Sequence, residues 1–146
     1  MKNEYIPGVC NIGREEIRMR WVTGWVGLAI TVAIWVGLMV SQSPAQRYVW
    51  LFVPAFVSAL GILQASMHFC VAFGAKGLFN FKPQIGKTET VDQMEFRAKD
   101  RAKAIRIMLY AFGIATIVTG IAYFTAGWSN WESFLTVFTL RAVMFL

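Results

Sequence analysis

The feature that most constrains this chain is a long apolar stretch, residues 17–75, which is interrupted by a single polar segment at residues 41–47. The interruption leaves two runs that are each long enough for a membrane-spanning helix, since ~20 residues rising ~1.5 Å each cross ~30 Å of hydrocarbon. The composition agrees, with 57% hydrophobic residues and a mean hydropathy of +0.52, above that of ordinary soluble domains. The sequence therefore predicts an all-α integral membrane protein.

The chain is expected to form a single polytopic membrane domain that starts with a polar head at residues 1–20 and a helical hairpin at residues 21–75. The first helix of the hairpin is predicted at residues 21–40, which contain no charged residue. Trp21 and Trp25 stand at its start, where an amphipathic ring favours the membrane interface.

The second helix of the hairpin is predicted to begin at Pro44 and to run to about residue 73. Its start is indicated by the segment 43–46, Ser-Pro-Ala-Gln, which has the pattern of a capping box with proline at the first helical position. Pro54 inside this helix is expected to kink it, because proline removes one backbone hydrogen bond. Three pairs of small residues, four apart, favour close helix packing: Ala33 with Gly37, Gly61 with Ala65, and Thr116 with Gly120.

Residues 76–106 form a basic connection between the hairpin and the third apolar run, with eight Lys/Arg and four Asp/Glu. The segment 90–93, Thr-Val-Asp-Gln, resembles a capping box, and apolar residues recur after it at helical spacing. This pattern predicts an amphipathic helix that lies on the membrane surface and leads directly into a third spanning helix at residues 107–127.

The C-terminal segment, residues 128–146, is expected to be a short half-helix. Trp128 and Trp131 are predicted to lie at the membrane interface. The apolar run 134–146 has only 13 residues and is too short for a full span. It contains Arg141, whose charge is costly in lipid, so we expect another subunit, a lipid phosphate or a cofactor carboxylate to neutralise it.

The distribution of Lys and Arg predicts the orientation. The head carries four of these residues and the basic connection carries eight, whereas the 41–47 turn carries only Arg47. The positive-inside rule then places the N-terminus and the connection in the cytoplasm of a bacterial cell, with the chain in the inner membrane.

His68 and Gln64 are the candidate cofactor-binding residues, because they lie one turn apart near the inner end of the second helix. One interpretation is that His68, the only histidine, is an axial ligand to a chlorophyll-type tetrapyrrole, which requires a single ligand. The other is that both side chains hydrogen-bond to a neighbouring helix or to a bound lipid. The pattern contains no metal-binding motif.

Cys10 and Cys70 are the only cysteines, and the predicted topology places both near the cytoplasmic face. A thiol relay is one interpretation, and ordinary packing is the other. The chain has no phosphate loop, no HExxH motif, no Ser/His/Asp set and no carboxylate pair within the membrane, so no catalytic residues are assigned and no enzymatic activity is expected.

Part of the chain, residues 9–80, resembles a known small membrane domain. The resemblance is carried by Asn11-Ile12-Gly13, Glu16, Arg18 and Arg20 before a Gly-rich helix, and by Phe69-Cys70, Gly74, Gly77, Phe79 and Asn80 after the second helix. These residues are similar to the YgaP-type two-helix inner-membrane domain, which is often fused to a rhodanese sulfurtransferase. The resemblance implies a compact hairpin with both cysteines on the cytoplasmic side. Val71 stands where that family usually has proline, and sulfur-transfer activity is not carried over.

Two functions are compatible with these features. The first is a non-catalytic accessory subunit of a larger bacterial membrane complex, respiratory or photosynthetic, with lipid and other integral membrane subunits as partners and no nucleic acid. It is favoured by the absence of catalytic motifs and by the short, charged C-terminal run. The alternative is a small transport or sulfur-handling membrane protein that uses Cys10, Cys70 and His68.

Overall fold

The computed structural model describes residues 5–82, 85 and 87–144, and it describes side chains up to Ala126. Its elements follow the order α1 (Arg14–Val40), the 3-10 helix η1 (Ala45–Leu51), α2 (Phe52–Ser66), α3 (Val71–Lys76), β1 (Leu78–Phe79), β2 (Glu89–Thr90) and α4 (Met94–Met144). Three stretches are long and apolar enough to cross a membrane: Arg14–Val40, Ala45–Ser66 and Met94–Ala126. The prediction of a helical membrane protein with three spanning helices is therefore confirmed.

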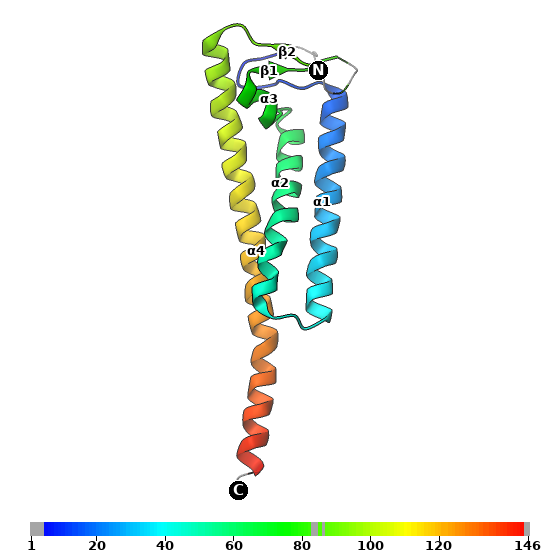
Figure 1. Ribbon diagram of the computed structural model, residues 1–146, viewed down its shortest axis with the longest axis vertical. Coiled ribbons are helices and arrows are strands. Elements are labelled where there is room, and N and C mark those ends of the chain that lie inside the picture. The colour runs from blue at the N-terminus through cyan, green and yellow to red at the C-terminus, as the bar shows by residue number, and fades with distance from the viewer. Residues whose placement is uncertain (1–4, 83–84, 86, 145–146) are drawn as a thin grey trace.

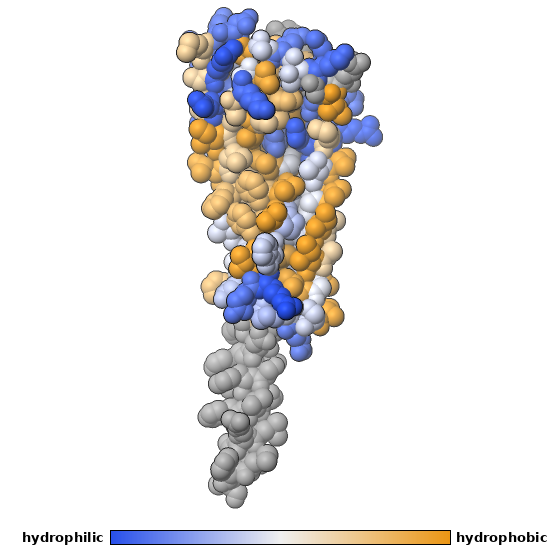
Figure 2. All heavy atoms as spheres, viewed as in Figure 1, coloured by the Kyte–Doolittle hydropathy of each residue, from blue (hydrophilic) through white to orange (hydrophobic). Residues whose placement is uncertain are grey.

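The three long helices lie side by side, and almost everything else gathers at one end of them (Figure 1). We call this the head end; it comprises residues 5–13, the α2–α3 link, α3, the antiparallel pair β1–β2 and the start of α4. The polar 41–47 turn lies at the opposite end. Apolar side chains cover the middle of the bundle, and hydrophilic ones concentrate at the head end and near the turn (Figure 2). The head and the basic connection therefore share one end, as the charge pattern predicted.

Helix α1 begins at Arg14, seven residues before the predicted start, so Arg14, Arg18 and Arg20 of the expected polar head are helical. Gly13 is the N-cap, and Glu15 and Glu16 occupy the first turn. Acidic residues there interact favourably with the partial positive charge of a helix N-terminus. The charged residues were the reason for predicting a polar head at residues 1–20, but charged residues do not prevent a helix from extending beyond the bilayer.

The start of the second spanning stretch differs from the prediction. No side chain caps it, and Ser43 Oγ lies 2.9 Å from Ser41 Oγ instead of bonding a helical N–H. The first turns are the 3-10 helix η1, and α2 begins only at Phe52. Pro54 thus falls in the first turn of α2, where its missing N–H removes no intrahelical bond. The proline follows a change of helix type and does not kink a continuous helix.

Helix α2 ends at Ser66, well before the predicted residue 73, because the chain forms a Schellman-type cap there. His68 has φ +51°, its N–H donates to the carbonyl of Ala65, and the N–H of Phe69 donates to the carbonyl of Gln64. Glycine usually occupies this left-handed position, and because histidine occupies it here, the turn could not be predicted from the residue types. The chain then restarts as α3, which ends at Gly77 with φ +67°.

Helices α1 and α2 cross with their backbones in close contact. A Cβ added to Gly61 would lie 2.7 Å from the backbone nitrogen of Gly24, and Ser58 Oγ donates to the carbonyl of Gly24 at 2.9 Å. The Gly61–Ala65 pair therefore packs as predicted. Gly37 and Gly120 have nothing within 4 Å of an added Cβ, so the other two small-residue pairs do not mark contacts within the described chain.

Helix α4 joins three segments that the sequence analysis treated separately. The basic stretch does not lie on the membrane surface as a separate helix; from Met94 it continues in one line with the third span. Thr90 is paired with Leu78 in the β1–β2 ladder, so the predicted capping box does not form. The half-helix expected at the C-terminus is the last part of the same helix. The side chains of Trp128, Trp131 and Arg141 lie outside the described part.

Candidate functional site

Asn11 is the residue that ties the head end together. Its side chain forms two hydrogen bonds with the backbone of Cys70: Nδ2 donates to the carbonyl at 3.1 Å, and the Cys70 N–H donates to Oδ1 at 2.7 Å. Its own backbone carbonyl accepts from the N–H of Asn80, and its N–H donates to the carbonyl of His68. Asn11 is fully buried, so these bonds replace the hydration that it loses on folding. One residue, through its side chain and its backbone, thereby joins the N-terminal segment to the α2–α3 link and to the segment after β1.

A second buried polar group links α1 to the same segments. Glu16 is 2% exposed, accepts a hydrogen bond from Asn80 Nδ2 at 3.2 Å and lies 3.7 Å from Arg20. Arg20 also donates from Nη2 to Cys70 Sγ at 3.2 Å. The residues that carry the resemblance to the YgaP-type domain thus meet in space. The Asn80–Glu16 and Arg20–Cys70 contacts join α1 to two other segments of the head end, whereas Glu16 and Arg20 lie one turn apart on α1 itself.

Asp100 holds the N-terminal segment against α4. It is fully buried, and it accepts hydrogen bonds from the Tyr5 hydroxyl at 2.8 Å and from the backbone N–H of Gly8 at 2.7 Å. Burial, together with the hydrogen bond and the charge of Asp100, raises the pKa of Tyr5 above its ordinary value. Lys103, three residues along the helix, donates to the carbonyl of Val9 at 2.7 Å. The start of α4 therefore serves as a platform for the head.

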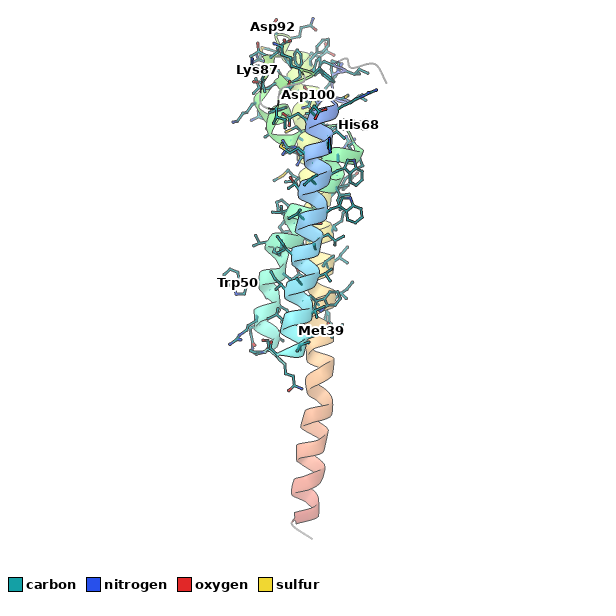
Figure 3. All side chains as sticks on the ribbon, turned by 90° about the vertical axis from the view of Figure 1, so that its right-hand side faces the viewer. Met39, Trp50, His68, Lys87, Asp92 and Asp100 are labelled. Atoms are coloured by element: carbon teal, nitrogen blue, oxygen red, sulfur yellow. The ribbon has the colours of Figure 1, made fainter. Side chains whose placement is uncertain are left out.

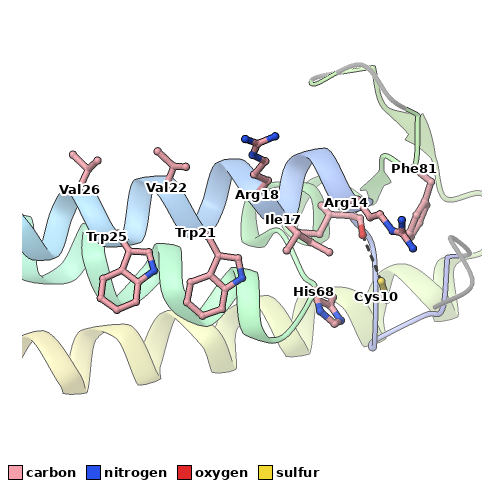
Figure 4. A pocket seen from close by; sticks show the side chains of 11 residues that line it. Cys10, Arg14, Ile17, Arg18, Trp21, Val22, Trp25, Val26, His68 and Phe81 are labelled. Atoms are coloured by element: carbon pink, nitrogen blue, oxygen red, sulfur yellow. Dashed lines mark hydrogen bonds between the residues drawn. The ribbon is translucent and has the colours of Figure 1, made fainter.

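A groove of about 750 Å³ opens beside α1 at this end. It is lined by Cys10, Ile12, Arg14, Ile17, Arg18, Trp21, Val22, Trp25, Val26, His68 and Phe81. The close view shows Arg18, Val22 and Val26 on one side of α1 and Trp21 and Trp25 on the other, with His68 and Cys10 at the head end (Figure 4). This volume is in the range of small-molecule sites.

The predicted cofactor pair is not brought together as a site. Gln64 is 5% exposed, and its Oε1 accepts from the backbone N–H of Val71 at 3.0 Å, so it serves the turn between α2 and α3. His68 lies at that turn and lines the groove. It lies at the head end of the molecule, as Asp100 and Lys87 do (Figure 3). Of the two residues, only His68 is placed where it could contact a ligand.

The two cysteines also have different surroundings. Cys10 is partly exposed and lines the groove, whereas Cys70 is fully buried and is not among the lining residues. Burial raises the pKa of the Cys10 thiol, and the charge of Lys103 opposes that effect. A raised pKa lowers the fraction of the nucleophilic thiolate. Within the described residues, no group of three His, Cys, Asp or Glu side chains is placed to hold a metal ion.

Sequence reasoning missed Arg14, Arg18 and Phe81 as parts of one groove. The signal was present in the spacing of Arg14 and Arg18, and of Trp21 and Trp25, since residues four apart share one helix face. It was overlooked because Arg14 and Arg18 were assigned to a head without helical structure. Phe81 could not have been found, because its place depends on the Ile12–Asn80 bridge that brings the chain beside α1.

The chain matches no protein-family model, no curated protein and no solved structure. The resemblance to the YgaP-type domain therefore stays a prediction. The groove and the hydrogen-bond network have to be interpreted from their own geometry.

Proposed function

We propose that this protein is a non-catalytic accessory subunit of a larger bacterial membrane complex, respiratory or photosynthetic, and that the distal part of α4 is its partner-binding element. The observation that supports this is the length of α4, 51 residues or about 76 Å of helix. That is far more than the ~30 Å of a bilayer core requires.

The distal part, residues 127–144, extends past the end of the bundle (Figure 1). Ala122 and Ala126 still pack against Tyr48 and Leu51 of η1. Beyond them, about 27 Å of helix has no neighbouring helix within the described chain. An isolated helix of this length is only marginally stable in water, and its sequence is mostly apolar. A helix of another subunit would bury that apolar surface.

The head end supports the same proposal. Gln64, which the sequence analysis offered as a cofactor-binding residue, bonds the backbone of Val71, Asn11 bonds the backbone of Cys70, and Asp100 holds the N-terminal segment. Such residues stabilise a scaffold and are not available to a substrate.

Co-purification with partner subunits tests this proposal. A chain truncated after Ala126 keeps the packing against η1 and should still insert and fold, but it should be lost from the complex in mild detergent. The Arg141→Gln variant should weaken association less than the truncation, because it removes one charge and leaves the helix. Full stoichiometric co-purification of the truncated chain would contradict the docking role.

The orientation belongs to this proposal as well: we place the head end in the cytoplasm of the bacterial cell. A reporter fused at Lys87 should then read cytoplasmic, and one fused at Ser43 should read external. The reverse result at both positions would invert the threading.

A sulfur-handling role is the second candidate, and one observation favours it: Cys10 and His68 line the same groove. Cys70 would contribute only indirectly, since it is buried against Arg20. Under this alternative, Cys10→Ser should abolish activity of the host complex while assembly stays normal. Under the accessory role, both activity and assembly should persist.

A further inference from the structure

The groove beside α1 changes character along its length. At the head end it is lined by the guanidinium-bearing residues Arg14 and Arg18 and by His68, and further along it is lined by Trp21, Val22, Trp25 and Val26. Among the described residues that line it, none is acidic. One end of the groove therefore suits an anion, and the other suits a hydrocarbon chain.

The cationic end is not neutralised within the described chain. Arg14 and Arg18 are both exposed, and neither forms an ion pair with a described carboxylate. Other basic residues nearby do have acidic partners, since Arg20 lies 3.7 Å from Glu16 and Lys99 lies 2.6 Å from Glu95. Two positive charges one helical turn apart are left for a ligand.

The apolar end lies along two rows of side chains on α1. Trp21 and Trp25 stack with ring centroids 6.5 Å apart and form one row, and Val22 and Val26 form the other (Figure 4). Trp25 is 58% exposed and Val26 is 52% exposed, so both rows are open to the medium around α1. Since α1 is one of the three candidate spans, the surrounding medium is lipid.

The position of the charges along α1 matches the depth of a phospholipid. From Arg18 to Val26 the helix rises about 12 Å, close to the thickness of one leaflet's hydrocarbon. Basic residues prefer the phosphate layer, and tryptophan prefers the zone just below it. Charge complementarity and depth thus favour an anionic lipid over a soluble anion or a flat ring cofactor.

We propose that this groove is a binding site for one anionic phospholipid, with its phosphate at Arg14 and Arg18 and an acyl chain along Trp21 and Trp25. His68 and Phe81 close the headgroup end. This proposal does not depend on the accessory-subunit role, because the site is formed entirely by the head end and α1.

The test is native mass spectrometry of the full chain in mixed micelles that contain phosphatidylglycerol and phosphatidylcholine of identical chain length. The native chain should retain phosphatidylglycerol in preference to phosphatidylcholine, by about tenfold if two cations contact the headgroup. The double variant Arg14→Gln/Arg18→Gln should lose this preference. Trp21→Ala/Trp25→Ala should lower retention of both lipids.

The matched control is Lys76→Gln/Arg101→Gln, which removes the same net charge from another exposed region of the head end and should keep the preference. Helicity and melting temperature of each variant establish that it is folded. The proposal would be overturned if Arg14→Gln/Arg18→Gln and Lys76→Gln/Arg101→Gln lost the preference for phosphatidylglycerol equally, or if the native chain retained the two lipids equally. It would also be overturned if inorganic phosphate alone protected the native chain against unfolding as well as phosphatidylglycerol does. So would a co-purifying quinone or tetrapyrrole that Arg14→Gln/Arg18→Gln does not affect and His68→Asn removes.

Discussion

At the head end of the bundle, hydrogen bonds between side chains and other groups join segments that are 50 to 95 residues apart in the sequence. At the opposite end, side-chain hydrogen bonds are local: Ser41 bonds to Gly37 and Ser43, and Thr125 bonds to Ala122. That end is held instead by the apolar packing of Tyr48 and Leu51 against α4. Polar bonds require specific partners and geometry, whereas apolar packing tolerates exchange of similar side chains.

The two ends of the molecule are therefore stabilised by different kinds of interaction. The head end is held by buried polar groups that bond specific partners, and the groove that we assign to a phospholipid is positioned by those bonds. Beyond Ala126, α4 has no neighbouring helix within the described chain. A fixed end and an open end suit a protein that positions itself in the membrane and presents a helix to a partner.

The largest expected effect comes from removing the Asn11 side chain. Asn11→Ala leaves the buried N–H of Cys70 without its partner and removes one of two hydrogen bonds to the Cys70 carbonyl, which keeps the N–H of Gly74; together these losses should cost about 2–4 kcal/mol of unfolding free energy. The matched change at the other end, Ser43→Ala, breaks only a contact between two hydroxyls and should cost less than about 0.5 kcal/mol. Thermal unfolding in detergent measures both. Similar losses would remove the contrast between the two ends.

The helix crossing should respond next most strongly. Gly61→Ala places a methyl group 2.7 Å from the backbone of Gly24, so the helices must separate, at a cost of about 1–3 kcal/mol. Gly120→Ala adds the same methyl where nothing lies within 4 Å and should be neutral or slightly stabilising, because alanine favours helix. The two melting temperatures decide the question, and equal shifts would show that the crossing is looser than described.

A smaller effect is expected at the two non-glycine residues with positive φ, one at each end: Gln42 with φ +48° and His68 with φ +51°. Glycine adopts this conformation without steric cost, so Gln42→Gly and His68→Gly should each stabilise by about 1 kcal/mol. Alanine at either position should not. If His68→Gly destabilises the protein instead, the imidazole makes contacts that outweigh the backbone strain.

The sequence predicted the features that depend on composition and missed those that depend on distant partners. The three apolar runs predicted three spanning helices, and the clustering of Lys and Arg predicted that the head and the basic connection lie at one end. The end of α2 was wrong because His68, not glycine, takes the left-handed position. The role of Asn11 could not be seen, since its partner lies 59 residues away.

The candidate site was predictable only in part. His68 and Cys10 were identified from their residue types, and they do line the groove. Gln64 and His68 do not lie one turn apart on one helix, because α2 ends at Ser66, and the cofactor-binding role itself stays a prediction. Arg14 and Arg18 were overlooked because charge was interpreted as a sign of a polar head, whereas α1 continues through it.

The smallest expected effect concerns the reactivity of the two thiols. Cys70 is fully buried and should not react with iodoacetamide in the folded protein. Burial raises the pKa of Cys10, so at pH 8 less of it is thiolate than in a free cysteine, whose pKa is about 8.5. Its alkylation should therefore be slow at pH 8 and should keep accelerating as the pH rises past 9.

The charge of Lys103 supplies the control. Because that charge opposes the effect of burial on Cys10, Lys103→Met should raise the pKa of the thiol further and slow alkylation at pH 8 by a few-fold. Lys99→Met, one turn earlier on α4, removes a charge that is paired with Glu95 and should leave the rate unchanged. Rates are measured by mass spectrometry over a pH series. Faster alkylation in Lys103→Met would mean that its bond to the carbonyl of Val9 shields Cys10 from solvent, because loss of that bond would expose the thiol.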